Sequence, residues 1–231
     1  MKRFWVLIAI ACLCLQPGCS GLRSGVLFAD ITIVQDGKAE AVIAIGTGVA
    51  WIDRHAAEEL SQFVEGMTGA RLEIVDADSS AAGDASNLIL IGRQENNKLI
   101  AALTAAGKVE LSASSPGGDG YTIKTISQGS RNYLVLGGSR GRGDLYAVYD
   151  FLEQDCGVGF FWNGDHVPQR ATLKFAGINR TEQPYFTRRM APNACSYVYT
   201  SQYWGVQEWC DELDYMSKRK LNMHYFTLGW E

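Results

Sequence analysis

Residues 133–152 read Y-L-V-L-G-G-S-R-G-R-G-D-L-Y-A-V-Y-D-F-L, and this stretch decides the fold around it. The apolar run at 133–136 has the length and the glycine boundary of a short strand. After the glycine-rich turn at 137–143, apolar side chains recur at 145, 148, 149 and 152, which is the spacing of one helix face. The stretch therefore predicts a strand, a turn and an amphipathic helix.

The glycine-rich turn lies between a strand and a helix, where a phosphate-binding loop would lie. Its pattern is G-G-x-x-G-x-G, which differs from the G-x-G-x-x-G of dinucleotide-binding turns, and no acidic residue follows a further strand at the expected distance. Its two arginines, Arg140 and Arg142, could hold an anion, but we interpret the turn as a tight strand-to-helix connection rather than as a nucleotide site.

Two hairpins are expected on either side of this unit. One would join 31–34 to 41–45 through Asp36-Gly37-Lys38, and the other would join 121–126 to 133–136 through Gln128-Gly129-Ser130.

The rest of the first 180 residues alternates short strands with amphipathic helices. Apolar spacing predicts helices around 56–67, 99–103 and 145–152, and further strands at 72–75, 87–91, 160–162 and 171–175. Gly69 suits a left-handed cap at the end of the first helix. The pattern predicts an α+β accessory domain over 27–180, a mixed sheet with covering helices, and the polar segment 178–184 suggests a domain boundary.

Residues 184–231 predict a different unit, the first strand-helix-strand of a truncated (β/α)8 barrel. On its helix Trp209, Leu213 and Met216 share the face that would pack on a sheet, and Glu212 falls on the solvated side. A single unit of this kind leaves strand edges unpaired. We therefore expect it to pack loosely on the accessory domain or to be poorly ordered.

In such a barrel the carboxyl ends of the strands carry the site. Those ends and the loop after the first strand would place five residues on one rim: Asn193, Cys195, Tyr199, Trp204 and Glu231. Amide, carboxylate and aromatic groups together suit a neutral sugar, which offers hydroxyls to hydrogen-bond and apolar ring faces. The aromatic residues would equally serve to pack the domain interface, and the sequence leaves both interpretations open.

Composition narrows the function classes. The net charge of −4 provides no basic footprint, which argues against a nucleic-acid partner. The three histidines are scattered, and no Cys/His set has the spacing of metal ligands, so we expect neither a metal nor a cofactor. Beyond the leader, Cys156, Cys195 and Cys210 are an odd number, which argues against a complete disulfide framework. Cys156 and Cys210 are expected to be small buried residues on helices.

The first 24 residues read as a signal peptide or a lipoprotein leader. Lys2 and Arg3 precede a short apolar run at 4–15, which matches an export signal and is too short for a stable membrane anchor. Gly18-Cys19 resembles the end of a bacterial lipobox, although Gln16 departs from its usual pattern. The leader predicts a periplasmic or cell-surface lipoprotein attached to a membrane through a lipid on Cys19, or alternatively a secreted protein.

Several motifs together carry a family resemblance. They are Asn193-x-Cys195, Tyr199, Tyr203-Trp204, Trp209-x-x-Glu212-Leu213-Asp214-Tyr215-Met216, Leu221-Asn222 and Gly229-x-Glu231. This series resembles the start of the catalytic barrel in family 89 glycoside hydrolases, the alpha-N-acetylglucosaminidases. The motifs A-A-E-E-L at 56–60, Y-A-V-Y-D-F-L-E at 146–153 and F-W-x-G at 161–164 are similar to the N-terminal domains of alpha-glucuronidases and beta-hexosaminidases.

The resemblance implies that Asn193 and Cys195 line the sugar pocket, with weaker roles for Tyr199, Trp204 and Glu231. It also implies that the two catalytic glutamates of the family lie beyond the last residue of this sequence. Tyr215 departs from the family, which commonly has tryptophan there.

The leading hypothesis is a fragment of an exo-acting glycoside hydrolase for alpha-linked N-acetylglucosamine, with the accessory domain and the first wall of the pocket. A retaining hydrolase needs two carboxyl groups about 5–5.5 Å apart, so we predict that the chain alone is inactive. One alternative is a non-catalytic carbohydrate-binding or structural surface module. Another is a fragment of an alpha-glucuronidase-like hydrolase, which needs cations such as Arg188 or Arg189 for the substrate carboxylate. Alternation along a strand would turn one of these two inward.

Overall fold

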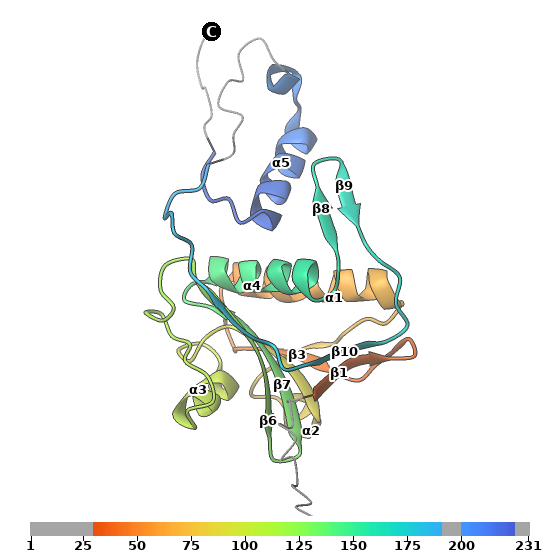
Figure 1. The fold of residues 1–231 in the computed structure, drawn as a ribbon, viewed down its shortest axis with the longest axis vertical. Coiled ribbons are helices and arrows are strands. Elements are labelled where there is room, and N and C mark those ends of the chain that lie inside the picture. Colours follow the sequence, from red (N-terminus) through yellow and green to blue (C-terminus); the bar gives the residue numbers. More distant parts are fainter. Residues whose placement is uncertain (1–29, 191–199, 225–231) are drawn as a thin grey trace, which may run out of the picture.

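The computed structural model of the 231-residue chain describes residues 30–190 and 200–224 (Figure 1). Its centre is a mixed six-stranded sheet in the order β11-β6-β7-β5-β3-β4. The strands are β3 (Val42–Ile45), β4 (Ile74–Asp76), β5 (Asn87–Ile91), β6 (Tyr121–Gln128), β7 (Arg131–Gly138) and β11 (Asn179–Glu182). Strands β4, β3, β5 and β7 run parallel, β6 is antiparallel to β7, and β11 is antiparallel to β6.

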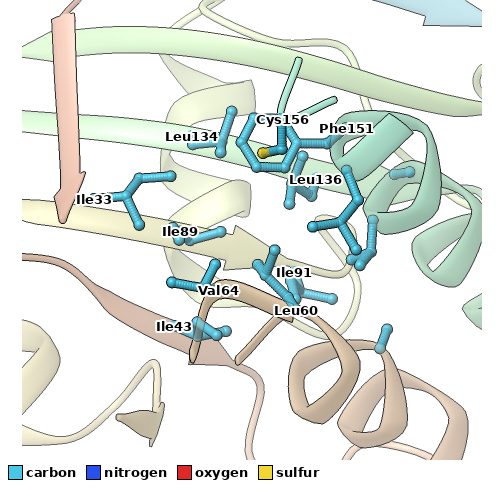
Figure 2. Packing of buried hydrophobic residues seen from close by; sticks show 14 of the residues in the cluster. Ile33, Ile43, Leu60, Val64, Ile89, Ile91, Leu134, Leu136, Phe151 and Cys156 are labelled. Atoms are coloured by element: carbon cyan, nitrogen blue, oxygen red, sulfur yellow. The ribbon is translucent and has the colours of Figure 1, made fainter. Parts of the chain in front are cut away.

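The sheet is buried on both faces because consecutive residues in the middle of the central strands are apolar. In β5, Ile89 and Ile91 belong to one hydrophobic cluster, and Leu88 and Leu90 belong to the other. Helices α1 (Trp51–Thr68) and α4 (Gly141–Gln154) cover the first face, side by side. The shorter helices α2 (Ser80–Asp84) and α3 (Lys98–Ala105) cover the second face. Figure 2 shows the first cluster between strands and helices.

The predicted strand-turn-helix unit is confirmed as β7, a tight turn and α4. The hairpin of β6 and β7 is also confirmed, with Gly129 in the turn at φ 64°. Gly69 takes the left-handed conformation after α1, and its N–H donates to the carbonyl of Glu65. The predicted mixed sheet with covering helices is confirmed, but the helices cover both faces of the sheet and not one.

The first predicted hairpin is partly wrong. The turn at Asp36 and Gly37 is present, and both residues have positive φ. It joins β1 (Asp30–Gln35) to the two-residue β2 (Lys38–Ala39), and β1 pairs on its other side with β10 (Leu173–Ala176). Strand β3 instead enters the large sheet between β4 and β5, because its apolar side chains must be covered on both faces.

The polar segment that suggested a boundary contains strand β11, which pairs with β6 along the edge of the large sheet. Next to the sheet, β8 (Gly159–Phe161) and β9 (Gly164–His166) form a hairpin that projects beside α5 (Val206–Lys218) (Figure 1).

The predicted start of a barrel is not confirmed. Within 184–190 and 200–224 the structure shows the short helix η1 (Thr200–Tyr203), helix α5 and one isolated parallel bridge between Met190 and Met223. The strand ends expected at 193–195 and 229–231 lie outside the described residues. In the part of the chain that the structure describes, no helix has the length and apolar character to cross a membrane.

Candidate functional site

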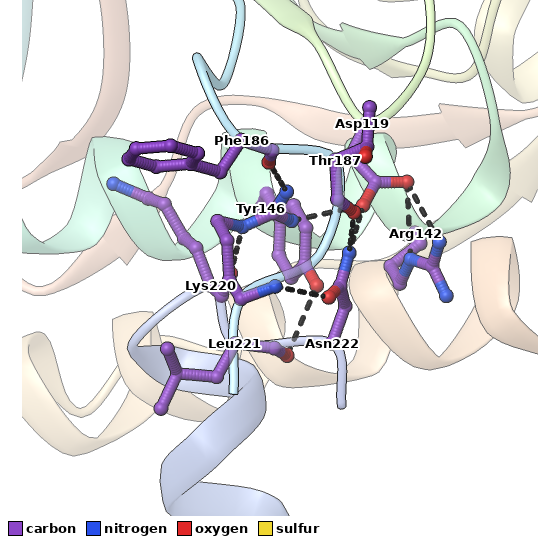
Figure 3. A network of polar contacts seen from close by, with 9 residues as sticks. Asp119, Arg142, Tyr146, Phe186, Thr187, Lys220, Leu221 and Asn222 are labelled. Atoms are coloured by element: carbon purple, nitrogen blue, oxygen red, sulfur yellow. Dashed lines mark hydrogen bonds and ion pairs between the residues drawn. The ribbon is translucent and has the colours of Figure 1, made fainter. Parts of the chain in front are cut away.

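A buried carboxylate, Asp119, holds the described residues of 184–224, which we call the C-terminal segment, on the α/β domain (Figure 3). Arg142 of α4 donates to one of its oxygens at 3.1 and 2.8 Å. Arg189 and Asn222 each donate to the other oxygen at 2.8 Å. Burial alone would raise the pKa of Asp119, but the hydrogen bonds from Arg142, Arg189 and Asn222 outweigh burial and hold this pKa below its usual range. Segments near 189 and 222 therefore meet at a charged junction.

Further contacts extend this junction along α4. The Tyr146 hydroxyl donates to the carbonyl of Leu221 at 3.2 Å, and Arg219 pairs with Glu153 at 2.6 Å. Lys220 pairs with Asp150. The expectation of loose packing is therefore wrong for the described residues around the junction.

A second contact, between α5 with the preceding Trp204 and the β8–β9 hairpin, is largely aromatic. The Trp162 ring at the tip of the β8–β9 hairpin lies 5.9 Å from Trp204 and 5.5 Å from Tyr215. Lys218 of α5 donates to Asp165 of the hairpin and to Asp214, both at 2.7 Å. Rings and ion pairs together hold the hairpin beside the helix.

Two adjoining hollows lie between the hairpin and α5, and we call them together the aromatic groove. The first has a volume of about 180 Å³ and is lined by Trp162, Trp204, Glu208, Asp211 and Glu212. The second has a volume of about 450 Å³ and is lined by Phe161, Trp162, Asn163, Gly164, Asp165, Asp211, Asp214, Tyr215 and Lys218. Trp162 and Asp211 border both hollows, so the groove is continuous around the exposed indole.

Glu212 is the buried acid of the groove, which corrects the prediction that it is solvated. Its side chain is 3% exposed, and one oxygen lies 3.6 Å from Nε2 of His224. The other oxygen, Oε2, has no hydrogen-bond partner in the structure described over 30–190 and 200–224. Burial raises the pKa of Glu212, and His224 opposes that rise. Glu212 therefore borders the first hollow, but its unpartnered Oε2 is closed off from it.

The charges of the groove select among ligands. Glu208, Asp211 and Glu212 line the first hollow, and no cation accompanies them there among the described residues. In the second hollow the ammonium of Lys218 is already paired with Asp165 and Asp214. Such a wall repels an anion and favours a neutral polar ligand with an apolar face.

Of the predicted site residues, Trp204 lies in the groove. Asn193, Cys195, Tyr199 and Glu231 lie outside the described residues, as does Cys19 in the leader, so their roles stay predictions. The described ranges contain no group of three His, Cys, Asp or Glu side chains that could hold a metal ion.

Among the cysteines, Cys156 is buried as expected and follows α4, whereas Cys210 on α5 is exposed, which corrects its predicted burial.

The glycine-rich turn is structural, as the sequence indicates. A Cβ atom at Gly143 would lie 2.7 Å from the carbonyl oxygen of Gly120, so backbones approach closely there. Asp144, fully buried in the first turn of α4, accepts from the Gly138 N–H at 2.5 Å and pairs with Arg93 at 3.1 Å. This carboxylate already uses donors beside the turn that a phosphate would need.

Part of the α/β domain matches a known family model. Residues 37–151 match the family model described as the glycosyl hydrolase family 67 N-terminus. A search of curated proteins finds no match.

Among solved structures, the chain is similar to a family GH115 4-O-methyl-alpha-glucuronidase with specificity for decorated arabinogalactans, with a TM-score of 0.56 and 15% identity. That match covers 84% of this chain and 25% of the other. A GH138 enzyme targeting pectin rhamnogalacturonan II matches with a TM-score of 0.45 and 15% identity, over 80% of this chain and 24% of the other. The chain thus spans about a quarter of the length of either structure, and the first likeness shows a shared fold.

Proposed function

We propose that this chain is the N-terminal region of an exo-acting glycoside hydrolase, in which the accessory domain and α5 form a groove for a neutral sugar of the glycan. The observation that carries the proposal is Trp162, 57% exposed, at the wall of a hollow that the exposed carboxylates of Glu208 and Asp211 also line. An indole face takes the apolar face of a sugar ring, and a carboxylate accepts from its hydroxyls. The match of 37–151 to a glycosyl hydrolase N-terminus supports the same class.

Within this class, the accessory domain supports a relationship to alpha-glucuronidases, because the solved structure with the same fold is described as one. An alpha-N-acetylglucosaminidase is the second candidate. The groove favours it, because carboxylates at 208, 211 and 212 would repel a uronic acid and accept from a neutral acetamido sugar. Its further support is the sequence resemblance over 193–231.

The proposal assigns binding, without hydrolysis, to the chain by itself. Glycoside hydrolysis needs two carboxyl groups that flank the scissile bond from opposite sides. In the first hollow Glu208, Asp211 and Glu212 all come from α5 and line one wall, and in the second hollow Asp165 of the hairpin is held in an ion pair by Lys218. We therefore expect no release of aryl alpha-glycosides.

The test is a calorimetric titration of the chain with N-acetylglucosamine and, separately, with methyl glucoside. Trp162→Ala should weaken binding about 2- to 10-fold, the range of a lost aromatic contact. Trp51→Ala is the matched control, since Trp51 is 75% exposed on α1 and does not border the groove. Equal binding by both variants and by the unchanged chain would remove the groove from the proposal.

A further inference from the structure

A second hollow, which we call the arginine pocket, lies at the other contact between the C-terminal segment and the α/β domain. It has a volume of about 230 Å³ and is lined by Gly117, Gly118, Asp119, Arg140, Arg142, Gln183, Pro184, Phe186, Thr187 and Arg189. Its position, near the start of α4, separates it from the hairpin that forms the aromatic groove beyond the end of that helix.

The charge of the arginine pocket is positive. The lining contains three guanidinium groups, those of Arg140, Arg142 and Arg189, and one carboxylate, that of Asp119, so its net charge is two positive charges. Both oxygens of Asp119 are occupied, one by Arg142 and the other by Arg189 and Asn222. The pocket is therefore electrostatically the opposite of the acidic groove.

The arginines differ in what they have left to donate. Each nitrogen of Arg189 already donates once, to the carbonyl of Lys220, the carbonyl of Phe186 and Asp119. Arg142 uses Nε and Nη2 on Asp119, and its Nη1 has no acceptor within the described ranges. Arg140 is exposed, and its guanidinium has no hydrogen bond or ion pair there either. Two adjacent arginines can thus still receive an anion.

An apolar plate completes the pocket. Phe186 is 67% exposed and lines the same hollow, next to the side-chain amide of Gln183. The volume is close to that of about eight water molecules at roughly 30 Å³ each, which is enough for a carboxylate and part of its ring. A bare inorganic ion would leave the plate unused, whereas a sugar acid would use both the ring and the charges.

We propose that the arginine pocket is an accessory binding site for a sugar acid of the glycan, with the carboxylate on Arg140 and Arg142 and the ring face on Phe186. The arginine fork matches a carboxylate geometrically, since two parallel N–H groups meet its two oxygens. The site is separate from the aromatic groove, so its failure would leave the groove proposal standing. Together the two sites would suit a glycan that carries both neutral and acidic residues.

The experiment is an NMR titration of the chain that follows the backbone amides of Gly117, Gly118 and Arg140. The probes are methyl glucuronide, methyl glucoside and sodium sulfate, each raised to about 50 mM so that a millimolar Kd would be reached. We expect methyl glucuronide to shift these amides and methyl glucoside to leave them unchanged. Arg140→Ala should weaken glucuronide binding about fivefold or more, and Phe186→Ala should weaken it as well.

Two comparisons keep the test decisive. Arg54→Ala is the matched control, because Arg54 is exposed on α1, is not among the pocket residues, and its loss changes the net charge equally. Arg140→Ala should fold normally, since the Arg140 side chain makes no capping hydrogen bond to α4. The proposal is overturned if glucuronide does not bind, if glucoside binds equally well, or if sulfate binds as tightly and Phe186→Ala has no effect.

Discussion

Replacing Asp119 by alanine removes the acceptor on which the junction depends. The Asp119 side chain is 6% exposed, Arg189 is 15% exposed and Arg142 is 43% exposed. Removing one partner of a buried ion pair costs about 3–5 kcal/mol. The exposed Arg142 adds little, because water screens its pair. We therefore expect Asp119→Ala to lower the free energy of unfolding by about 3 kcal/mol, the low end of this range.

For a domain of this size, a loss of about 3 kcal/mol lowers the melting temperature by about 6–12 °C. Thermal melts and urea titrations at pH 7 measure the loss, and hydrogen exchange locates it. Exchange should rise first at the amides of 189, 222 and 223, whose backbone contacts meet at the junction. The matched control is Asp78→Asn, whose exposed pair with Lys98 should leave the midpoint unchanged.

The pH dependence of this variant has a defined sign. The folded pKa of Asp119 lies below its ordinary value of 3.8, so its contribution is complete above that pH and is lost as the pH falls through the folded pKa. The difference in the free energy of unfolding between the unchanged chain and Asp119→Ala should therefore shrink in acid. An Asp119→Ala variant that melts like the unchanged chain, with unchanged exchange near 189 and 222, would refute this reasoning.

Two other variants test the groove helix and the glycine turn. Glu212→Gln should raise the melting temperature at pH 7. The pKa of Glu212 is raised in the folded state, so the contribution of Glu212 to stability is complete below the ordinary value of 4.5 and is lost as the pH rises through the folded pKa. Melts across this range should show the difference vanishing in acid, and a difference that is constant with pH would contradict the assignment. Gly143→Ala should cost about 1–3 kcal/mol through its clash with Gly120, whereas Gly83→Ala, which meets no atom within 4 Å, should be neutral or slightly stabilising in urea titrations. Equal midpoints for the two glycine variants would show that the turn tolerates a side chain.

The sequence indicates the central elements of the fold because their signals are local. Strand β5 is apolar from Leu88 to Ile91, and α1 repeats its apolar side chains at helical spacing, so each is recognisable without its partners. Strand β11 is missed because its residues, Asn-Arg-Thr-Glu, are polar and pair at the sheet edge. The first hairpin fails because turn residues at Asp36 and Gly37 fix the turn but not how far the pairing extends.

The candidate site was partly within reach of the sequence. Trp204 was predicted as a site residue, whereas the residues at 162–166 suit a binding loop and a buried tryptophan before an Asn-Gly turn equally well, and the structure shows Trp162 exposed. Glu212 was placed on the wrong side, although it lies four residues before the buried Met216 and therefore shares its helix stripe. Arg140 and Arg142 share one turn, where the sequence already suggested that they could hold an anion, but Phe186 and Arg189 reach them only through the tertiary contact at Asp119.

The central claim is that the aromatic groove takes a neutral sugar, and a crystal structure of the chain grown with N-acetylglucosamine tests it most directly. The account predicts a sugar ring against the exposed face of Trp162, with its hydroxyls donating to carboxylates that line the groove. A groove that stays empty at saturating sugar, or a sugar bound elsewhere on the domain, would contradict it.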